Sequence, residues 1–144
     1  MKINFFKSPI LSTLMLALVT LSFSSCGNDD DTADLPLKDR LAGTWDINSY
    51  KLGGDEYMGL LFESAYLKFD AYTGTHGQIE QGVVFPGEGA FVLTGIYSVD
   101  EENDEVNMEY EGDTITAQIE ITGNKLVWQS LQDGYTLELK ATRR

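Results

Sequence analysis

The chain has 144 residues and a strongly acidic balance, with 23 Asp and Glu against 10 Lys and Arg and a formal net charge of −13. A surface this acidic repels nucleic acid and anionic lipid, so neither is expected as a partner. The chain has one cysteine, so no disulfide can form within it, and a cysteine-based metal site would lack its other thiolate ligands.

The first 25 residues have the organisation of a secretory signal peptide. Lys2 and Lys7 give it a basic start, and the apolar stretch from Ile10 to Phe23 carries no charge. This stretch is shorter than the roughly 20 apolar residues that cross a bilayer, and it ends in small residues instead of a basic stop. We therefore expect residues 1–25 to be removed on export.

The segment Phe23-Ser24-Ser25-Cys26-Gly27 resembles the lipobox of bacterial lipoproteins, although that family more often has leucine where Phe23 stands. In that family the signal peptide is cleaved before the cysteine, diacylglycerol is attached to the thiol, and the new amino group is acylated, for example with palmitate. The resemblance implies lipidation of Cys26, which also explains the lone thiol. Each buried methylene contributes about 0.8 kcal/mol, so several acyl chains anchor a protein firmly to a membrane.

Residues 26–37 are predicted to form a flexible acidic tether. They include Asp29, Asp30, Asp31 and Asp34 and few large apolar residues, so they cannot bury enough surface to order themselves. An acidic run directly after a lipidated cysteine resembles the signal that exports some lipoproteins of Gram-negative bacteria to the cell surface. We expect an outer-membrane location, with the periplasmic and the cell-surface face both open.

Residues 38–144 are predicted to form one β-rich domain, because alternation of apolar residues dominates and helical periodicity is almost absent. The expected strands lie at about 45–50, 65–69, 78–84, 91–99, 106–110, 114–122, 125–130 and 135–141. Gly123-Asn124 and Asp133-Gly134 suit tight hairpin turns. Residues 56–62 have helical spacing and predict a short helix or lid.

The number and order of these strands predict the fold. About eight strands, connected mostly to their neighbours in sequence, favour an up-and-down antiparallel β-barrel, because closure removes exposed edges. A two-sheet β-sandwich is the alternative, since alternation alone does not show closure. The sequential hairpins and the absence of a second cysteine favour the barrel.

Four segments in this order resemble the lipocalin-like domain of bacterial lipoproteins: Leu41-Ala42-Gly43-Thr44-Trp45, Gly95-Ile96-Tyr97-Ser98-Val99, Ile121-Thr122-Gly123-Asn124-Lys125-Leu126 and Gly134-Tyr135-Thr136-Leu137-Glu138-Leu139. In lipocalins a tryptophan on the first strand plugs the closed end of the barrel, and a basic side chain from the last strand lies across its ring. The resemblance therefore implies Trp45 as the barrel plug. Its basic partner would be Lys140, Arg143 or Arg144, through a cation–π contact.

No constellation of catalytic residues is apparent. His76 lies in a glycine-flanked turn, and the sequence places neither a nucleophile nor an orienting carboxylate beside it. The acidic segment Asp100–Glu105 is the best candidate for calcium, but it lacks the glycine and the spaced glutamate of an EF-hand, so a solvated hairpin tip is expected. We expect a non-enzymatic protein without cofactor or metal.

An eight-stranded barrel has an interior just wide enough for side chains or one small ligand. The residues expected to face inward and line a ligand site are Phe69, Phe91, Tyr97, Tyr110, Trp128 and Tyr135. The sequence thus favours a monomeric, lipid-anchored envelope protein that binds a small apolar or amphipathic molecule. The alternative is a filled barrel that serves as a structural or protein-interaction platform. A continuous void of about 300 Å³ or more favours the ligand.

Overall fold

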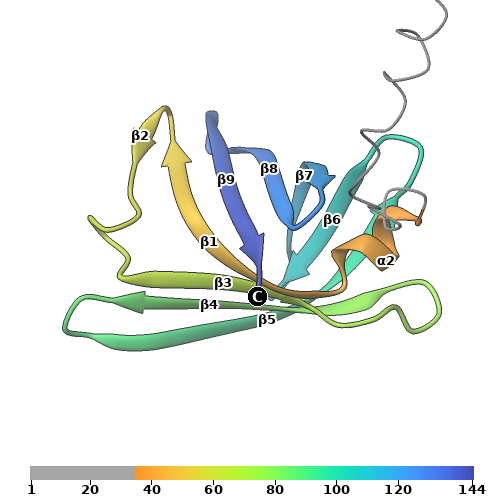
Figure 1. Cartoon of the computed structure of the whole chain (residues 1–144), viewed down its shortest axis with the longest axis horizontal. Coiled ribbons are helices and arrows are strands. Elements are labelled where there is room, and N and C mark those ends of the chain that lie inside the picture. The colour runs from red at the N-terminus through yellow and green to blue at the C-terminus, as the bar shows by residue number, and fades with distance from the viewer. Residues whose placement is uncertain (1–34) are drawn as a thin grey trace, which may run out of the picture. The chain divides into compact units, whose positions relative to one another are not determined.

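Nine strands and one short helix make up residues 35–144, the part of the chain that the computed structural model describes (Figure 1). The elements are α2 (Leu37–Leu41), β1 (Gly43–Leu52), β2 (Asp55–Glu56), β3 (Ser64–Phe69), β4 (Gly77–Phe85), β5 (Gly89–Asp100), β6 (Glu105–Tyr110), β7 (Asp113–Thr122), β8 (Lys125–Gln132) and β9 (Tyr135–Arg143). The predicted signal peptide, Cys26 and most of the predicted tether lie outside the described residues. Within those residues no helix is long and apolar enough to cross a membrane.

The strands form a closed antiparallel barrel. From β3 to β9 each strand pairs with the next, and β1 joins the two ends of this meander by pairing with both β3 and β9. The β1–β9 pairing runs from Trp45 opposite Arg143 to Leu52 opposite Leu137. This closure gives eight barrel strands, with β2 as an extra two-residue strand on β1, and it confirms the predicted up-and-down barrel over the open sandwich.

Alternation within the strands sorts side chains between the interior and the solvent. In β7, Ala117 and Ile119 are buried, whereas Gln118 and Glu120, which alternate with them, are exposed. The turn before β9 has positive φ at both Asp133 (50°) and Gly134 (82°), the backbone conformation that two-residue hairpins require. The hairpin turn predicted at Asp133-Gly134 is therefore present.

The short helix expected at residues 56–62 does not form. After β2 the chain makes turns in which the carbonyl of Tyr57 accepts hydrogen bonds from the backbone N–H groups of Leu60 and Leu61. Gly59 takes a positive φ of 77°, which a right-handed helix cannot accommodate. Met58 and Phe62 of this segment pack on the barrel, whereas Leu61 is 48% exposed, so the helical spacing of the apolar residues does not produce a helix.

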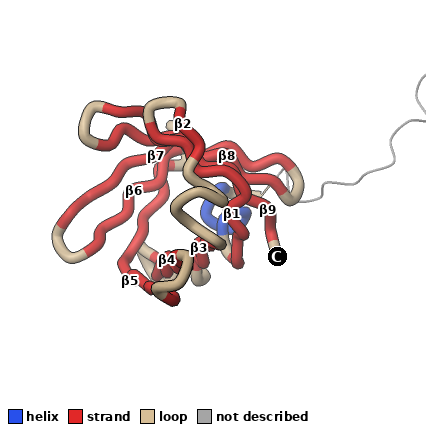
Figure 2. Tube along the Cα trace, turned by 90° about the vertical axis from the view of Figure 1, so that its left-hand side faces the viewer, coloured by secondary structure: helices blue, strands red, loops and turns tan. Residues whose placement is uncertain are grey.

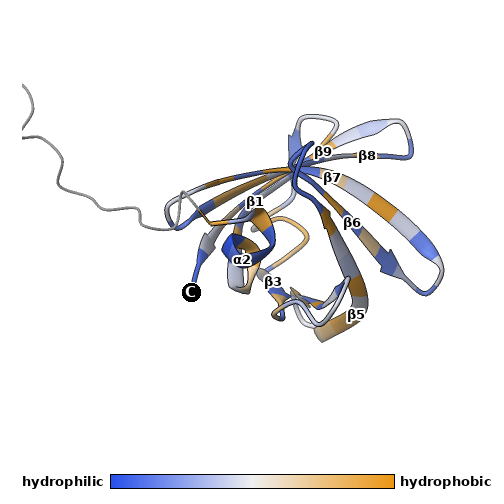
Figure 3. Ribbon diagram, turned by 90° about the vertical axis from the view of Figure 1, so that its right-hand side faces the viewer, coloured by the Kyte–Doolittle hydropathy of each residue, from blue (hydrophilic) through white to orange (hydrophobic). Residues whose placement is uncertain are grey.

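The two ends of the barrel differ. At one end the strands gather around α2, which is seen in front of them in Figure 3. At the other end the β4–β5 hairpin projects beyond β6, because β5 pairs with β4 from Gly89 to Tyr97 but with β6 only from Ile96 to Asp100. Figure 2 is viewed from this second, open end.

Candidate functional site

The end of the barrel at α2 is closed by an apolar plug. Leu37 and Leu41 of α2 are buried, and the side chain of Trp45 beneath them is 0% exposed. The Trp45 indole Nε1 donates a hydrogen bond to the carbonyl of Leu41 at 2.8 Å. The polar group of this buried ring is thereby satisfied, and the ring also holds the end of the helix.

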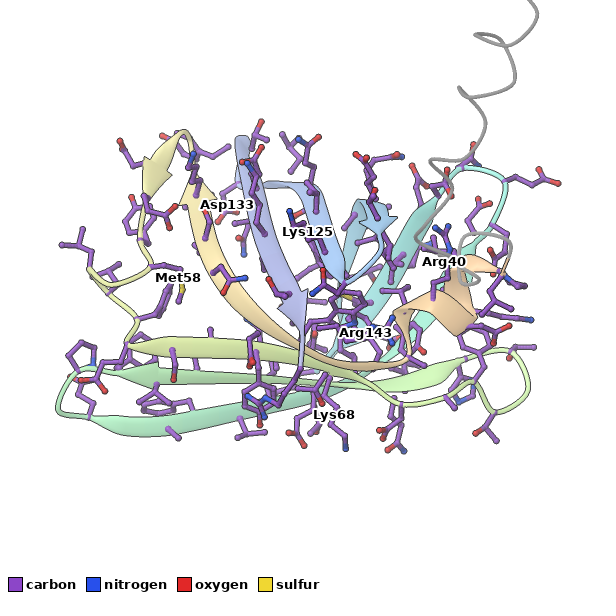
Figure 4. All side chains as sticks on the ribbon, in the orientation of Figure 1. Arg40, Met58, Lys68, Lys125, Asp133 and Arg143 are labelled. Atoms are coloured by element: carbon purple, nitrogen blue, oxygen red, sulfur yellow. The ribbon has the colours of Figure 1, made fainter. Side chains whose placement is uncertain are left out.

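Arg143 is the basic residue that covers the plug. Its guanidinium carbon lies 4.4 Å from the centroid of the Trp45 ring, and its two terminal nitrogens donate to the carbonyls of Ala42 and Arg40. The other two candidates point elsewhere: Lys140 pairs with Glu138, and Arg144 pairs with Asp46. Figure 4 shows Arg143 between the end of β9 and α2. Arg143 lies in phase with the buried Leu139 and Ala141 of β9, whereas Lys140 and Arg144 do not. This alternation is the sequence signal that distinguishes Arg143 from the other two candidates.

A distant carboxylate caps α2. No side chain caps the helix locally, but Glu101, in the β5–β6 turn, accepts hydrogen bonds from the backbone N–H groups of Leu37 (2.6 Å) and Lys38 (3.1 Å). The neighbouring Asp100 accepts from Asn103 and Glu102, and these hydrogen bonds lower the pKa of its carboxyl group. The acidic segment considered for calcium thus has two of its carboxylates in structural roles. Residues 35–144 contain no cluster of three potential metal ligands.

Two of the predicted lining residues belong to the core of the closed end. The ring centroids of Phe69 and Tyr97 are 5.0 Å apart, and Tyr72 lies 5.3 Å from Tyr97. The Tyr97 hydroxyl donates to the carbonyl of Asp70 at 2.7 Å, and burial raises the pKa of Tyr97 to about 12. Phe69 and Tyr97 therefore pack against each other and do not line the pocket inside the barrel described below.

Two other predicted residues, Tyr110 and Trp128, line a pocket inside the barrel. Its volume is about 70 Å³, and it is lined by Tyr50, Leu67, Gln81, Met108, Tyr110, Ile115, Trp128, Gln132, Leu137 and Leu139. Burial raises the pKa of Tyr110 to about 12, so its hydroxyl stays protonated. The Trp128 indole donates to the Ser130 hydroxyl at 3.2 Å. The pocket is thus mainly apolar and aromatic, with the amides of Gln81 and Gln132 and the hydroxyls of Tyr50 and Tyr110 as side-chain hydrogen-bonding groups.

A row of aromatic rings leads from this pocket to the open end. Ring-centroid distances are 6.5 Å from Tyr57 to Tyr50, 5.2 Å from Tyr50 to Phe62, 5.4 Å from Phe62 to Phe85 and 5.4 Å from Phe85 to Phe91. We call these five residues the aromatic row. They come from β1, the β2–β3 connection and the β4–β5 hairpin, so the sequence did not suggest that they meet.

The remaining two predicted lining residues lie at the rim of the open end. Phe91 is 57% exposed and ends the aromatic row. Tyr135 is 61% exposed, and its ring lies against Gly53 in the turn after β1. The six predicted residues are therefore divided among the pocket, the closed-end core and the rim.

A carboxylate fastens the β2–β3 connection across the open end. Glu56 accepts hydrogen bonds from the backbone N–H groups of Tyr50 (2.8 Å) and Met58 (3.0 Å) and from the hydroxyl of Ser49. Desolvation acts to raise the pKa of Glu56, but these hydrogen bonds and the charge of Lys51 outweigh it, and the net effect is a lowered pKa. Met58, labelled in Figure 4, consequently packs against the core from this connection.

His76 lies in an exposed turn. Its Nδ1 is 3.5 Å from the Thr75 hydroxyl, and among residues 35–144 it forms no salt bridge with a carboxylate. This arrangement provides no orienting group for a general base.

No protein-family model and no curated protein matches the chain. Several solved structures resemble it. A redesigned β-barrel, b11L5F_LGL, matches with a TM-score of 0.57 and 11% identity, covering 77% of this chain and 97% of its own. The redesigned barrel mFAP1, bound to DFHBI, matches with a TM-score of 0.53 and 17% identity over 76% of this chain and 100% of its own. The siderocalin Ex-FABP matches with a TM-score of 0.50 and 15% identity over 72% of this chain and 74% of its own. At these identities the likeness shows the fold alone, a lipocalin-like antiparallel β-barrel.

Proposed function

We propose that this protein is a non-enzymatic binding protein, held in the bacterial envelope by lipid on Cys26, that takes up a small apolar or amphipathic molecule at the open end of its barrel. The observation that carries this proposal is the aromatic row leading to the pocket lined by Tyr110 and Trp128. Aromatic walls with a few polar groups are typical of small-molecule sites.

The size of the pocket restricts the ligand. Its 70 Å³ is well below the roughly 300 Å³ of most small-molecule sites. A ligand would therefore insert one narrow group beside Trp128 and lay the rest of its surface on the aromatic row. Gln81 and Gln132 can each donate and accept a hydrogen bond, which suits a neutral polar group on the inserted part. The net charge of −13 disfavours an anionic ligand.

Two of the similar structures support ligand binding as a use of this fold. mFAP1 is bound to DFHBI, and Ex-FABP functions through dual ligand specificities. Their low identity means that no binding residue carries over to this chain. The support is therefore for the class of function and not for a particular ligand.

Binding of Nile red, a neutral planar dye, tests the site. Replacing Phe62 and Phe85 together by Ala removes the middle of the aromatic row and should weaken binding by about tenfold, since each aromatic pair contributes about 0.5–1.5 kcal/mol. The matched control is Leu131→Ala, because Leu131 is 74% exposed on β8 and lies outside the pocket and the row. Equal affinity in the double variant and the control would refute the proposed site. Native mass spectrometry of the protein from its own host would then identify any ligand that remains bound.

The membrane anchor is tested separately. Cys26→Ser should abolish lipidation and retention in the membrane fraction while leaving the barrel of residues 41–141 folded. Lipidation measured by mass spectrometry that persists in this variant would refute the assignment. Protease treatment of intact cells distinguishes the two faces of the outer membrane, because only a surface-exposed barrel is accessible to the protease.

A filled barrel that serves as an interaction platform is the second candidate function. The small pocket volume favours it, because most of the interior is occupied by side chains such as Trp45, Tyr97 and Phe69. The platform becomes the better account if neither Nile red nor any host molecule binds the protein.

A further inference from the structure

One edge of β5 has no neighbouring strand. On one side, β5 pairs with β4 along its length from Gly89 to Tyr97. On the other side, β6 reaches only to the pair Ile96–Glu109, and no other strand among residues 35–144 pairs with Gly89–Gly95. Figure 1 shows this part of β5 running along the lower left, away from β6. The outward N–H and C=O groups of this edge are available to another extended backbone.

The residues of this free edge are apolar and uncharged. Phe91, Val92 and Leu93 are 57%, 56% and 40% exposed, and no charged residue occurs from Gly89 to Val99. The register with β4 is regular from Gly89 to Tyr97, without a bulge. Proteins usually protect an exposed edge with a charge, a proline or a bulge. An unprotected regular edge is the geometry to which an added strand binds.

The part of the barrel around the free edge is strongly acidic. Residues 69–124, which contain β4 to β7, include no Lys or Arg. The same segment has twelve acidic residues: Asp70, Glu80, Glu88, Asp100, Glu101, Glu102, Asp104, Glu105, Glu109, Glu111, Asp113 and Glu120. Glu88 precedes one end of the edge, and Glu109 pairs with Ile96 at the other end. The free edge is therefore apolar along its length and acidic at both ends.

We propose that this edge binds an extended segment of another protein, apolar in its centre and basic at its ends, which adds to β5 as a further strand. Backbone hydrogen bonds to Gly89–Gly95 would supply affinity, and Lys or Arg beside Glu88 and Glu109 would supply specificity. The added strand takes the place along β5 that β6 leaves empty.

A second copy of this chain fits the edge less well. Antiparallel pairing of two β5 edges about Val92 places Gly89 of one copy opposite Gly95 of the other. Glu88 of each copy would then lie close to Glu109 of the other, and such like-charge contacts oppose association. The charge pattern thus favours a basic partner over self-pairing.

This inference goes beyond the proposed small-molecule site and does not depend on it. Side chains an odd number of positions apart in a strand point to opposite faces. Tyr97 of β5 is buried in the barrel, so Val92, five positions earlier, points away from the interior. Val92 and Thr94 are absent from the pocket lining. Variants at these two positions can therefore disturb strand addition while leaving Nile red binding unchanged.

The probe is a synthetic peptide of alternating Val and Thr with two Lys at each end, blocked at both termini, added to the full chain in mild detergent. A matched peptide has Glu in place of Lys. With the Lys peptide, hydrogen exchange should show new protection of those amides of Gly89–Gly95 that point away from β4, which belong to alternate residues because the others already donate to β4. Affinity for the Glu peptide should be lower by at least about tenfold at low salt, because like charges at an interface cost several kcal/mol.

Val92→Lys and Thr94→Lys each place a positive charge on the edge and should weaken Lys-peptide binding by about tenfold or more. Gln129→Lys is the control, because Gln129 is also exposed but is paired on both sides, with Gln118 of β7 and Glu138 of β9. Protection absent from Gly89–Gly95, or equal affinity for the two peptides, would overturn the proposal. Protection of the same amides that grows with protein concentration and without peptide would also overturn it, since the occupant would then be a second copy.

Discussion

The two ends of this barrel use the same kinds of side chain for opposite purposes. At the closed end, Trp45 is fully buried, its indole N–H is hydrogen-bonded, and Arg143 covers its ring. At the open end, the aromatic row stretches from the half-buried Tyr57 and Tyr50 to the exposed Phe91. Aromatic rings that are buried and hydrogen-bonded within the chain contribute to its stability, whereas rings that remain exposed are available to bind another molecule.

The strand lengths account for this difference. At the α2 end β7 runs past its last pair with β6, Gln118 opposite Glu105, but here Arg40 of α2 donates to the carbonyl of Ile121. A carboxylate from the β5–β6 turn also fastens the helix. At the other end β5 outruns β6, and a loop instead of a strand crosses between β1 and β3. The same meander therefore produces one sealed end and one open end.

The largest expected effect is at the plug. Trp45→Ala should lower the free energy of unfolding by about 3–5 kcal/mol, because it leaves a cavity where a fully buried ring was packed. Phe91→Ala at the open rim removes a ring that is 57% exposed and pairs with Phe85, and should cost only about 0.5–1.5 kcal/mol. Denaturant unfolding of both variants measures the contrast. Similar losses at the two positions would show that the ends do not differ as described.

Arg143 should come next in magnitude. Arg143→Gln removes the cation from the Trp45 ring and the paired hydrogen bonds to the Ala42 and Arg40 carbonyls, and we expect a loss of about 2 kcal/mol. Arg144→Gln is the matched control, because its ion pair with Asp46 is solvent-exposed and such pairs contribute less than about 1 kcal/mol. An equal effect of both substitutions in denaturant unfolding would contradict the assignment of Arg143 as the cover of the plug.

The remote cap of α2 should have a smaller effect. Glu101→Ala leaves the N–H groups of Leu37 and Lys38 without their carboxylate acceptor, which should cost about 1 kcal/mol, as loss of a helix cap does. Glu102→Ala, one residue further along the same turn, removes an exposed side chain and serves as the control. Reduced hydrogen-exchange protection confined to α2 would support the role of Glu101. Unchanged protection would contradict it.

Features set by a few neighbouring residues could be predicted from the sequence, whereas features that depend on contacts between distant segments could not. The hairpin turn at Asp133-Gly134 and the alternation of β7 were predictable because turn residues and apolar periodicity act over a few positions. Alternation in phase with Leu139 and Ala141 separates Arg143 from Lys140 and Arg144, but its position opposite Trp45 depends on the register of β9 against β1, two strands distant in sequence. The free edge of β5 could not be predicted, because alternation in Phe91–Val99 is the same whether or not a neighbouring strand reaches it.

The candidate site was only partly predictable for the same reason. Tyr110 and Trp128 were expected to face inward, and they line the pocket. Period-two alternation assigns a side chain to the interior but does not say how deep it lies, so it could not separate the core residues Phe69 and Tyr97 from the rim residues Phe91 and Tyr135. Tyr50, Phe62 and Phe85 of the aromatic row come from segments distant in sequence, and only the barrel geometry brings them together.

The smallest expected effect is a pH dependence at the open end. The pKa of Glu56 is lowered from its ordinary value of 4.5 in the folded state, so its contribution to the order of the β2–β3 connection is present above that value. The contribution is lost as the pH falls through the lowered pKa, because a protonated carboxyl accepts the hydrogen bonds of Tyr50 and Met58 less strongly. The amide chemical shifts of these two residues should follow this titration in an NMR experiment, and in Glu56→Gln they should not. If the amide shifts of Tyr50 and Met58 still followed the same titration in Glu56→Gln, another group would be responsible, and the role of Glu56 in ordering the β2–β3 connection would have to be abandoned.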